Sequence, residues 1–131
     1  MRGRLLALMI LAGLAGIGCG GLTPEEHASL AAKGYYEHLM HGEYEQFLEG
    51  MDIQALAGQE DYHAQLLENL RQYASQQQAQ HRGIREVRVS NAKTDTAQKY
   101  TAVFLVLCFG DSTNEEVVVP MVEREGRWRM K

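Results

Sequence analysis

Histidine and glutamate side chains gather near residue 40 at a spacing that is compatible with metal binding. His38 and His41 are three residues apart, and Glu37 and Glu45 lie nearby in the sequence. Residues three or four apart share one face of a helix, so two imidazoles could reach the same ion. A structural zinc site needs four ligands, however, and no cysteine or second cluster completes this set. We therefore expect neither a metal nor a cofactor, and interpret these residues as exposed polar side chains.

Tyrosines are the second group of residues that could support chemistry, because the helical half of the chain is rich in them. Phenolic hydroxyls assist a carboxylate base in several small enzymes. Here every aspartate falls in a predicted loop, turn or helix start, and no glutamate is embedded in an apolar strand. We interpret the tyrosines as amphipathic residues of the core and its rim, and assign no catalytic residue. The candidates for ligand contact are Tyr35, Tyr36, Tyr44 and Tyr73.

Composition and motifs exclude several classes of function. The formal net charge is −4, from 13 basic and 17 acidic residues, so the chain lacks the basic surface of a nucleic-acid-binding protein. No glycine-rich phosphate loop, serine nucleophile motif or paired metal motif is present. Cys108 lies in an apolar run over 103–109, without the cationic surroundings that activate a thiolate, and is expected to be a buried thiol. We therefore do not expect an enzyme.

The first nineteen residues have the order of an export signal. Two arginines precede an apolar stretch from Leu5 to Leu14, and small residues then lead to Cys19. The apolar stretch is shorter than the roughly 20 residues that span a bilayer. The arrangement resembles a bacterial lipoprotein signal, in which the cysteine at the cleavage site is diacylated and carries palmitate-like chains. An ordinary secretory signal and an uncleaved N-terminal anchor are the alternatives.

The resemblance to lipoprotein signals implies a three-part organisation. Residues 1–18 would be the signal peptide, 19–23 the lipidated cysteine and a short tether, and 24–131 a single domain of ordinary size. The lipid would attach the chain to a membrane of the bacterial cell envelope. No aspartate follows Cys19 directly, which in enterobacterial lipoproteins favours the outer membrane, on its periplasmic or surface face.

The remaining sequence predicts helices followed by strands. Thr23 and Glu26 form a capping-box pattern before a helix, and apolar positions at helical spacing predict further helices over 43–51 and about 61–81. Apolar residues then alternate with polar ones, which predicts strands over 86–90, 99–109 and 115–123, and a last strand after Gly126. We expect an α+β fold in which the helices pack on a curved antiparallel sheet of about four strands.

Nearly all of residues 23–131 resemble the nuclear transport factor 2-like (NTF2-like, also cystatin-like or SnoaL-like) domains of short bacterial lipoproteins of unknown function. The resemblance rests on the lipoprotein signal, a first helix ending in His41–Phe47, a long middle helix, and strands that close on Glu125–Met130. The resemblance implies a cone formed by the curved sheet, and it brings no assigned active site. It favours a non-catalytic module that binds a small apolar ligand or an envelope protein. An isomerase- or hydrolase-like enzyme with a pocket carboxylate and tyrosines is the alternative, and a purely structural envelope component is a third.

The long predicted strand is apolar on both of its faces. Its two alternating sets are possible interfaces, and a strand with one face in water should alternate with polar residues instead. We expect the second face to be covered by another protein, most simply a second copy, unless strong curvature brings helix ends over it. Pro120 in the next strand cannot donate to the ladder and predicts a bulge. The interface candidates are Phe104, Leu105, Val106 and Leu107.

Overall fold

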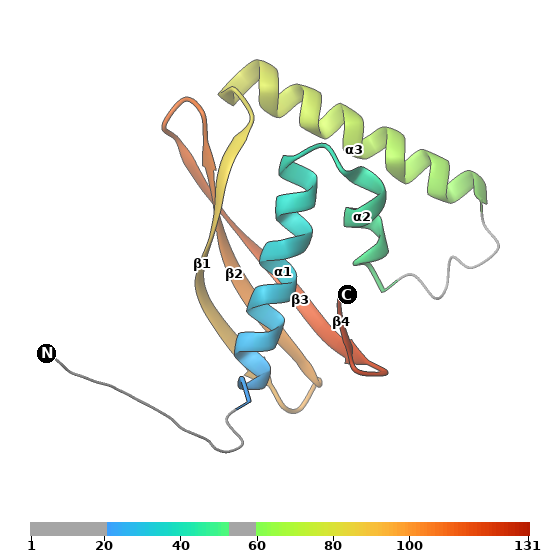
Figure 1. Ribbon diagram of the computed structural model, residues 1–131, viewed down its shortest axis with the longest axis vertical. Helices are drawn as coiled ribbons and strands as arrows, with labels where there is room; N and C mark the ends of the chain where they lie inside the picture. Colours follow the sequence, from blue (N-terminus) through green and yellow to red (C-terminus); the bar gives the residue numbers. More distant parts are fainter. Residues whose placement is uncertain (1–20, 53–59) are drawn as a thin grey trace, which may run out of the picture.

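The computed structural model describes residues 21–52 and 60–131, and the predicted signal peptide and Cys19 lie outside these ranges. Three helices precede four strands, as the sequence predicts (Figure 1). The strands form one antiparallel, unclosed sheet in the order β1-β2-β3-β4, so the expected α+β meander is confirmed. The elements are α1 (Pro24–Met40), α2 (Tyr44–Glu49), α3 (Glu60–His81), β1 (Ile84–Asp95), β2 (Tyr100–Phe109), β3 (Asn114–Arg124) and β4 (Arg127–Met130).

The start of α1 follows the predicted capping box. The backbone N–H of Glu26 donates to the Thr23 hydroxyl at 3.1 Å, and the Thr23 N–H donates to the Glu26 carboxylate at 2.8 Å. Two otherwise unpaired backbone donors are thereby satisfied at the helix end. The helix then buries Ala28, Ala32 and Leu39 against the sheet.

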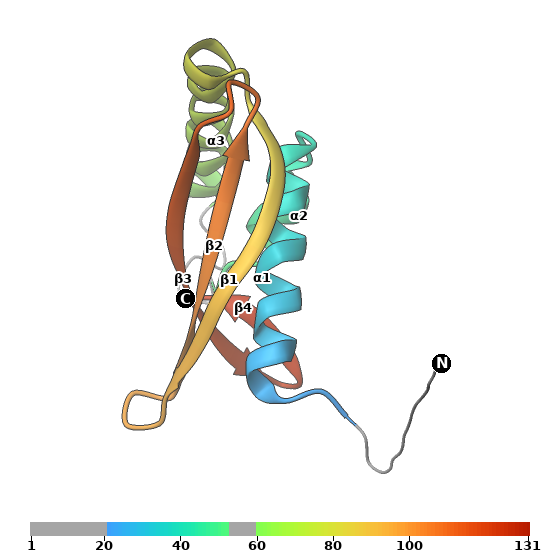
Figure 2. The same cartoon turned by 90° about the vertical axis from the view of Figure 1, so that its left-hand side faces the viewer.

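All three helices lie on one face of the sheet, and Figure 2 shows the other face turned toward the viewer. On β2 the helix-covered set includes Leu105 and Leu107, which are both fully buried. Leu105 and Leu107 are therefore core residues, and the prediction that they contribute to an interface is wrong. Phe104 and Val106 lie on the outer face and are half-buried.

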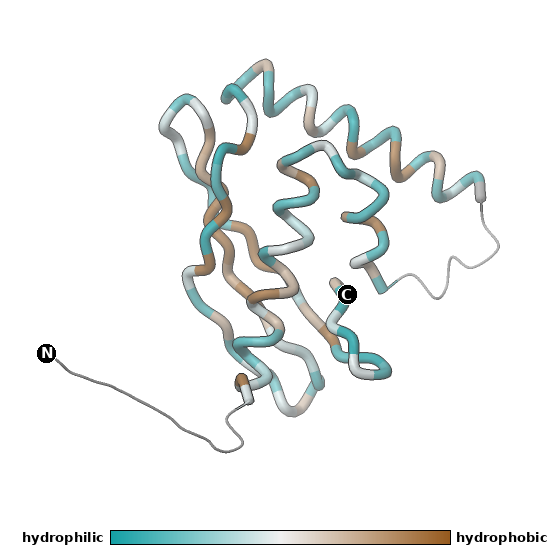
Figure 3. Tube along the Cα trace, viewed as in Figure 1, coloured by the Kyte–Doolittle hydropathy of each residue, from teal (hydrophilic) through white to brown (hydrophobic). Residues whose placement is uncertain are grey.

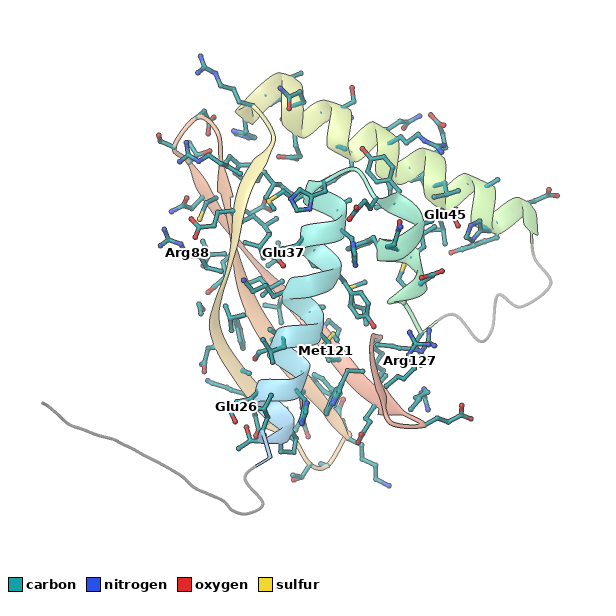
Figure 4. All side chains as sticks on the ribbon, viewed as in Figure 1. Glu26, Glu37, Glu45, Arg88, Met121 and Arg127 are labelled. Atoms are coloured by element: carbon teal, nitrogen blue, oxygen red, sulfur yellow. The ribbon has the colours of Figure 1, made fainter. Side chains whose placement is uncertain are left out.

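No helix of the described residues covers the outer face of the sheet. Val118, which pairs with Phe104 across β2 and β3, is 54% exposed. Arg88 pairs with Val106, and Figure 4 shows its side chain extending away from the helices. The outer face thus carries an apolar strip beside charged residues, available to another protein. In Figure 3 the hydrophobic residues gather along the strands, whereas α3 is mostly hydrophilic.

The register irregularities lie in β1, between Ile84 and Glu86 and between Val89 and Asn91, and not at Pro120. The register of β1 against β2 shifts between Val89 and Asn91, and the strand continues to Asp95 beyond its predicted end near Ser90. Pro120 pairs with Ala102 without a shift. Its carbonyl accepts from the N–H of Lys131, so its nitrogen also points toward β4 and no hydrogen bond to β2 is lost.

A polar cluster fastens the end of α3 to the β2–β3 turn. His81 Nδ1 lies 2.9 Å from Asp111 Oδ2, and the Thr113 hydroxyl donates to the other carboxylate oxygen. The backbone N–H of Asp111 also donates to the carbonyl of His81, at 3.0 Å. The Thr113 hydroxyl and, next, the His81 imidazole hold the pKa of Asp111 at about 2, below its ordinary 3.8.

Stability should therefore fall as this carboxylate takes up a proton. A carboxyl group with a lowered pKa in the folded state stabilises that state above its ordinary pKa, and this contribution is lost as the pH falls toward the folded value. We expect Asp111→Asn to melt below the wild type at pH 5, and the two melting curves to converge between about pH 4 and pH 2. Thermal unfolding followed by circular dichroism measures this. A difference in Tm that stays constant over this range would contradict it.

The chain segment after α2 is hydrogen-bonded to β4, at the other end of the sheet. The N–H of Met130 donates to the carbonyl of Gly50, and the N–H of Asp52 donates to the carbonyl of Met130, both at 2.6 Å. Beside this junction the Tyr35 hydroxyl donates to the carbonyl of Trp128 at 2.7 Å. These bonds tie α1 and the end of α2 to β4.

Candidate functional site

A cavity of about 460 Å³ lies between the C-terminal end of α1, the second half of α3 and the start of β1. We call it the α1–α3 pocket. Its wall combines apolar and tyrosine side chains with two arginines, a histidine and amides. The lining residues are Leu39, Met40, His41, Gly42, Tyr44, Arg71, Tyr73, Ala74, Ser75, Gln77, Gln78, Arg82, Gly83 and Ile84.

The α3 wall of the pocket follows from residue spacing. Arg71, Ser75, Gln78 and Arg82 are separated by four, three and four residues, which places them along one face of the helix and its exit. At about 1.5 Å per residue this row is roughly 16 Å long. This wall of the pocket therefore follows α3 and has an arginine toward each end.

The opposite wall is set by the turn between α1 and α2. Gly42 has φ +78, a conformation that glycine adopts without strain. The turn is held by the N–H of Glu43, which donates to the carbonyl of His38 at 2.8 Å. The reversal places His41 and Tyr44 at the same cavity.

The structure divides the four candidate tyrosines. Tyr44 and Tyr73 line the pocket, whereas Tyr35 bonds to Trp128 on the β4 side of α1. Tyr36 packs edge-on against Phe47, with ring centroids 5.3 Å apart. Only two of the four candidates are thus available to a ligand in this cavity.

Burial raises the pKa of both Tyr36 and Tyr73, and the charge of Glu115 adds to the increase in each. Glu115 pairs with Leu107, which places it on the helix-covered side of β3, although its side chain is exposed. We predicted no carboxylate in this region. The alternation of β3 could have shown it, because Glu115 shares the face of Val117 and Val119.

The arginines of the pocket were also missed. The signal that could have found them is the polar row Arg71, Ser75 and Gln78 at helical spacing, which leads to Arg82 just after the helix. Most of the glutamine-rich run over 75–80 is exposed. Three residues of this run, Ser75, Gln77 and Gln78, nevertheless line the pocket together with Arg71 and Arg82.

The histidines and glutamates near residue 40 form separate pairs. His38 Nδ1 lies 2.7 Å from Glu43 Oε1, and His63 Nε2 lies 2.9 Å from Glu45 Oε1. Figure 4 shows Glu37 and Glu45 on different helices. Within residues 21–52 and 60–131, no three histidine, cysteine or acidic side chains are grouped so that they could hold an ion.

A second, apolar groove of about 570 Å³ lies between the first turns of α1 and the middle of β1. Leu22, Leu30 and Val89 line it and are exposed. Its polar rim is already paired, since Glu25 contacts Thr94 and Glu26 caps the helix.

None of the helices in the described ranges is long and apolar enough to cross a membrane.

Comparison with known proteins establishes the fold. The sequence matches no protein family profile, and no curated protein matches it. Among solved structures, it is similar to a protein from Campylobacter jejuni that is provisionally named an NTF2-like transpeptidase. The TM-score is 0.62 at 12% identity, over 76% of this chain and 92% of that one. The chain therefore has an NTF2-like fold, as its sequence indicated.

Proposed function

We propose that this protein is a lipid-anchored, non-catalytic module of the bacterial cell envelope that binds a small ligand in the α1–α3 pocket. The observation that carries the proposal is the pocket itself. Its volume of about 460 Å³ falls within the range of roughly 300–1,000 Å³ that is typical of small-molecule sites. Apolar walls at Leu39, Met40 and Ile84 can shield part of a ligand, and a few polar groups can orient it.

The lining favours binding over catalysis. Acid–base catalysis needs a group within hydrogen-bond reach of the substrate, and the described lining offers the exposed imidazole of His41 but no carboxylate or thiol. A histidine base is usually oriented by an acidic partner, and the described lining supplies none. The competing candidate is an isomerase- or hydrolase-like enzyme in which Glu115 acts with Tyr73. It is favoured by the influence of Glu115 on the pKa of that tyrosine. An activity that Glu115→Gln abolishes, with binding retained, would establish this second candidate.

Ligand binding is tested by filling the pocket. Ala74 lines the cavity, whereas Ala79 is exposed on the same helix and does not. We expect protein purified from its own membranes to carry a small molecule in native mass spectrometry, and Ala74→Trp to lose it. The matched variant Ala79→Trp should retain it. Equal occupancy in both variants, with unchanged Tm, would place the ligand elsewhere.

Membrane attachment is proposed to occur through Cys19, which ends the signal-like segment. In a bacterial host, Cys19→Ala should move the protein out of the membrane fraction or leave it unprocessed. A shift from nearly complete to nearly absent membrane association is expected, because the acyl chains would supply the affinity. Fractionation and intact mass measure this. Wild-type mature chain that is recovered without a lipid mass would contradict it.

We also propose that the outer face of the sheet pairs with a second copy. Phe104, Val106 and Val118 form its apolar strip, and Val106 lies between Arg88 and Glu116 on the neighbouring strands. A two-fold pairing brings identical patches together, so opposite charges on either side of an apolar row can meet each other.

A further inference from the structure

We infer that the α1–α3 pocket selects amphiphilic ligands with an anionic head group, a carboxylate or a phosphate. This inference rests on the proposed function, because it names the class of ligand that the same cavity would take. The starting observation is an imbalance of charge. The whole chain has a net charge of −4, yet the pocket is lined by Arg71 and Arg82 and by no described carboxylate.

Neither arginine is neutralised by a close ion pair among the described residues. The guanidinium of Arg71 lies 3.8 Å from the carboxylate of Glu68, and both side chains are more than half exposed. An exposed pair at that distance is weak, so it competes poorly with a bound anion. Arg82 lies at the exit of α3, with no carboxylate within ion-pair distance in the described ranges.

The backbone fixes where Arg82 starts. Arg82 has φ +65 and Gly83 has φ +76, so the chain turns sharply out of α3 at this point. The turn is held by the N–H of Gly110, which donates to the carbonyl of Gly83 at 2.9 Å. The base of the Arg82 side chain is therefore anchored to the β2–β3 turn and does not depend on a frayed helix end.

Helix dipoles oppose an anion here, but they are smaller than the arginine charges. The pocket lies near the C-terminal ends of α1 and α3, and each end is equivalent to roughly −0.5 of an elementary charge. Two such ends offset about one of the two guanidinium charges. Several terminal carbonyls are also capped, since the N–H of Gly83 donates to Gln77 and that of Arg82 to Gln78. Arg71 and Arg82 are the only permanently charged side chains in the described lining, and Glu68 and Glu115, which act on Arg71 and Tyr73, do not line it. The charges nearest to a bound head group are therefore positive.

The remaining lining suits an apolar tail. Met40, Tyr44 and Tyr73 offer surfaces for an alkyl chain or ring, and the row from Arg71 to Arg82 extends roughly 16 Å along α3. A guanidinium binds a carboxylate or phosphate through two parallel hydrogen bonds, which supplies orientation as well as affinity. An anionic head at one arginine, with its tail along the apolar wall, uses both parts of the pocket.

The test uses four probes that share one tail: octanoate, octyl phosphate, 1-octanol and octylammonium. Binding to the wild-type protein is measured by calorimetry at 0.15 M salt. We expect at least one of the two anions to bind about ten-fold or more tightly than octanol, as one charge-assisted hydrogen bond allows. Octylammonium should bind more weakly than octanol. The ratio of octanoate to octyl phosphate distinguishes a fatty-acid ligand from a phospholipid-like one.

Variants that remove one charge test whether Arg71 and Arg82 cause the preference for anions. Arg71→Gln or Arg82→Gln should reduce the ratio of anion to octanol affinity toward one while octanol still binds, which shows that the pocket is intact. Arg85→Gln is the matched control, because Arg85 is exposed on β1 and does not line the cavity.

Three outcomes would overturn the inference in different ways. If octanol and octylammonium bind as tightly as the anions, the charge preference is wrong and the proposed pocket stands. If Arg85→Gln has the same effect as the pocket variants, the anion does not bind in the pocket. If no probe binds, the proposed function fails together with the inference.

Discussion

Replacing Leu105 by glutamate should leave the chain unfolded, whereas the same replacement at Val106 should leave it folded. Leu105 is fully buried beneath the helices, so its substitution places a carboxylate in the core. The cost of burying an unpaired charge is several kcal/mol, a large part of the roughly 5–15 kcal/mol that stabilises a domain. Val106 lies on the outer face, where the new carboxylate can reach water. Far-UV circular dichroism and thermal melting distinguish the two variants.

The same pair tests the proposed second copy. Sedimentation equilibrium of the wild-type protein should show a dimer, and Val106→Glu should shift it to a folded monomer. Two like charges facing each other across a two-fold axis cost several kcal/mol in a dry interface. A wild-type monomer at high concentration would contradict the dimer. Unfolding of both variants would show that the outer face is needed within the single chain.

Replacing Gly50 by alanine should be strongly destabilising although its backbone is ordinary. An added Cβ would lie 2.4 Å from Cδ1 of Tyr35, closer than any real contact. The Tyr35 ring cannot easily move aside, because its hydroxyl is bonded to the carbonyl of Trp128. Overpacking of this kind costs typically about 1–3 kcal/mol.

Gly34 provides the matched control for this substitution. It lies within α1, and an added Cβ there meets nothing within 4 Å. Gly34→Ala should stabilise the domain by about 0.5–1 kcal/mol, the usual gain inside a helix. Urea denaturation measures both changes through the midpoint. A midpoint for Gly50→Ala equal to that of the wild type would show that the contact with Tyr35 relaxes without cost.

Local patterns predicted the elements and their order in the sheet, but not which strand face is buried or where the register shifts. The capping box at Thr23 and the apolar strand over 99–109 depend on near neighbours, and both were confirmed. Which face of β2 is buried could not be predicted, because both sets are apolar and only the packing of α1 decides between them. The extension of β1 past Ser90 was missed for a related reason, since a bulge is set by the partner strand.

The site was harder to predict than the fold. Tyr35 and Tyr36 are adjacent in the sequence, yet one faces β4 and the other packs on Phe47. The pocket joins residues from α1, α3 and β1, which no local spacing relates. Arg71 and Arg82 could be seen in the sequence, but not that they line a pocket. The pocket also needs the turn at Gly42, which places His41 and Tyr44 opposite α3.

The bulge in β1 also affects how the protein behaves at high concentration. β1 is an edge strand of the unclosed sheet, with a long row of backbone groups that another chain could pair with. The register shift at Val89 to Asn91 interrupts that row, and Arg88 and Lys93 place charges on either side of it. An incoming strand would meet a break in hydrogen bonding together with like charges from its own copy. The domain is thereby protected against edge-to-edge polymerisation while the broad outer face of its sheet stays accessible.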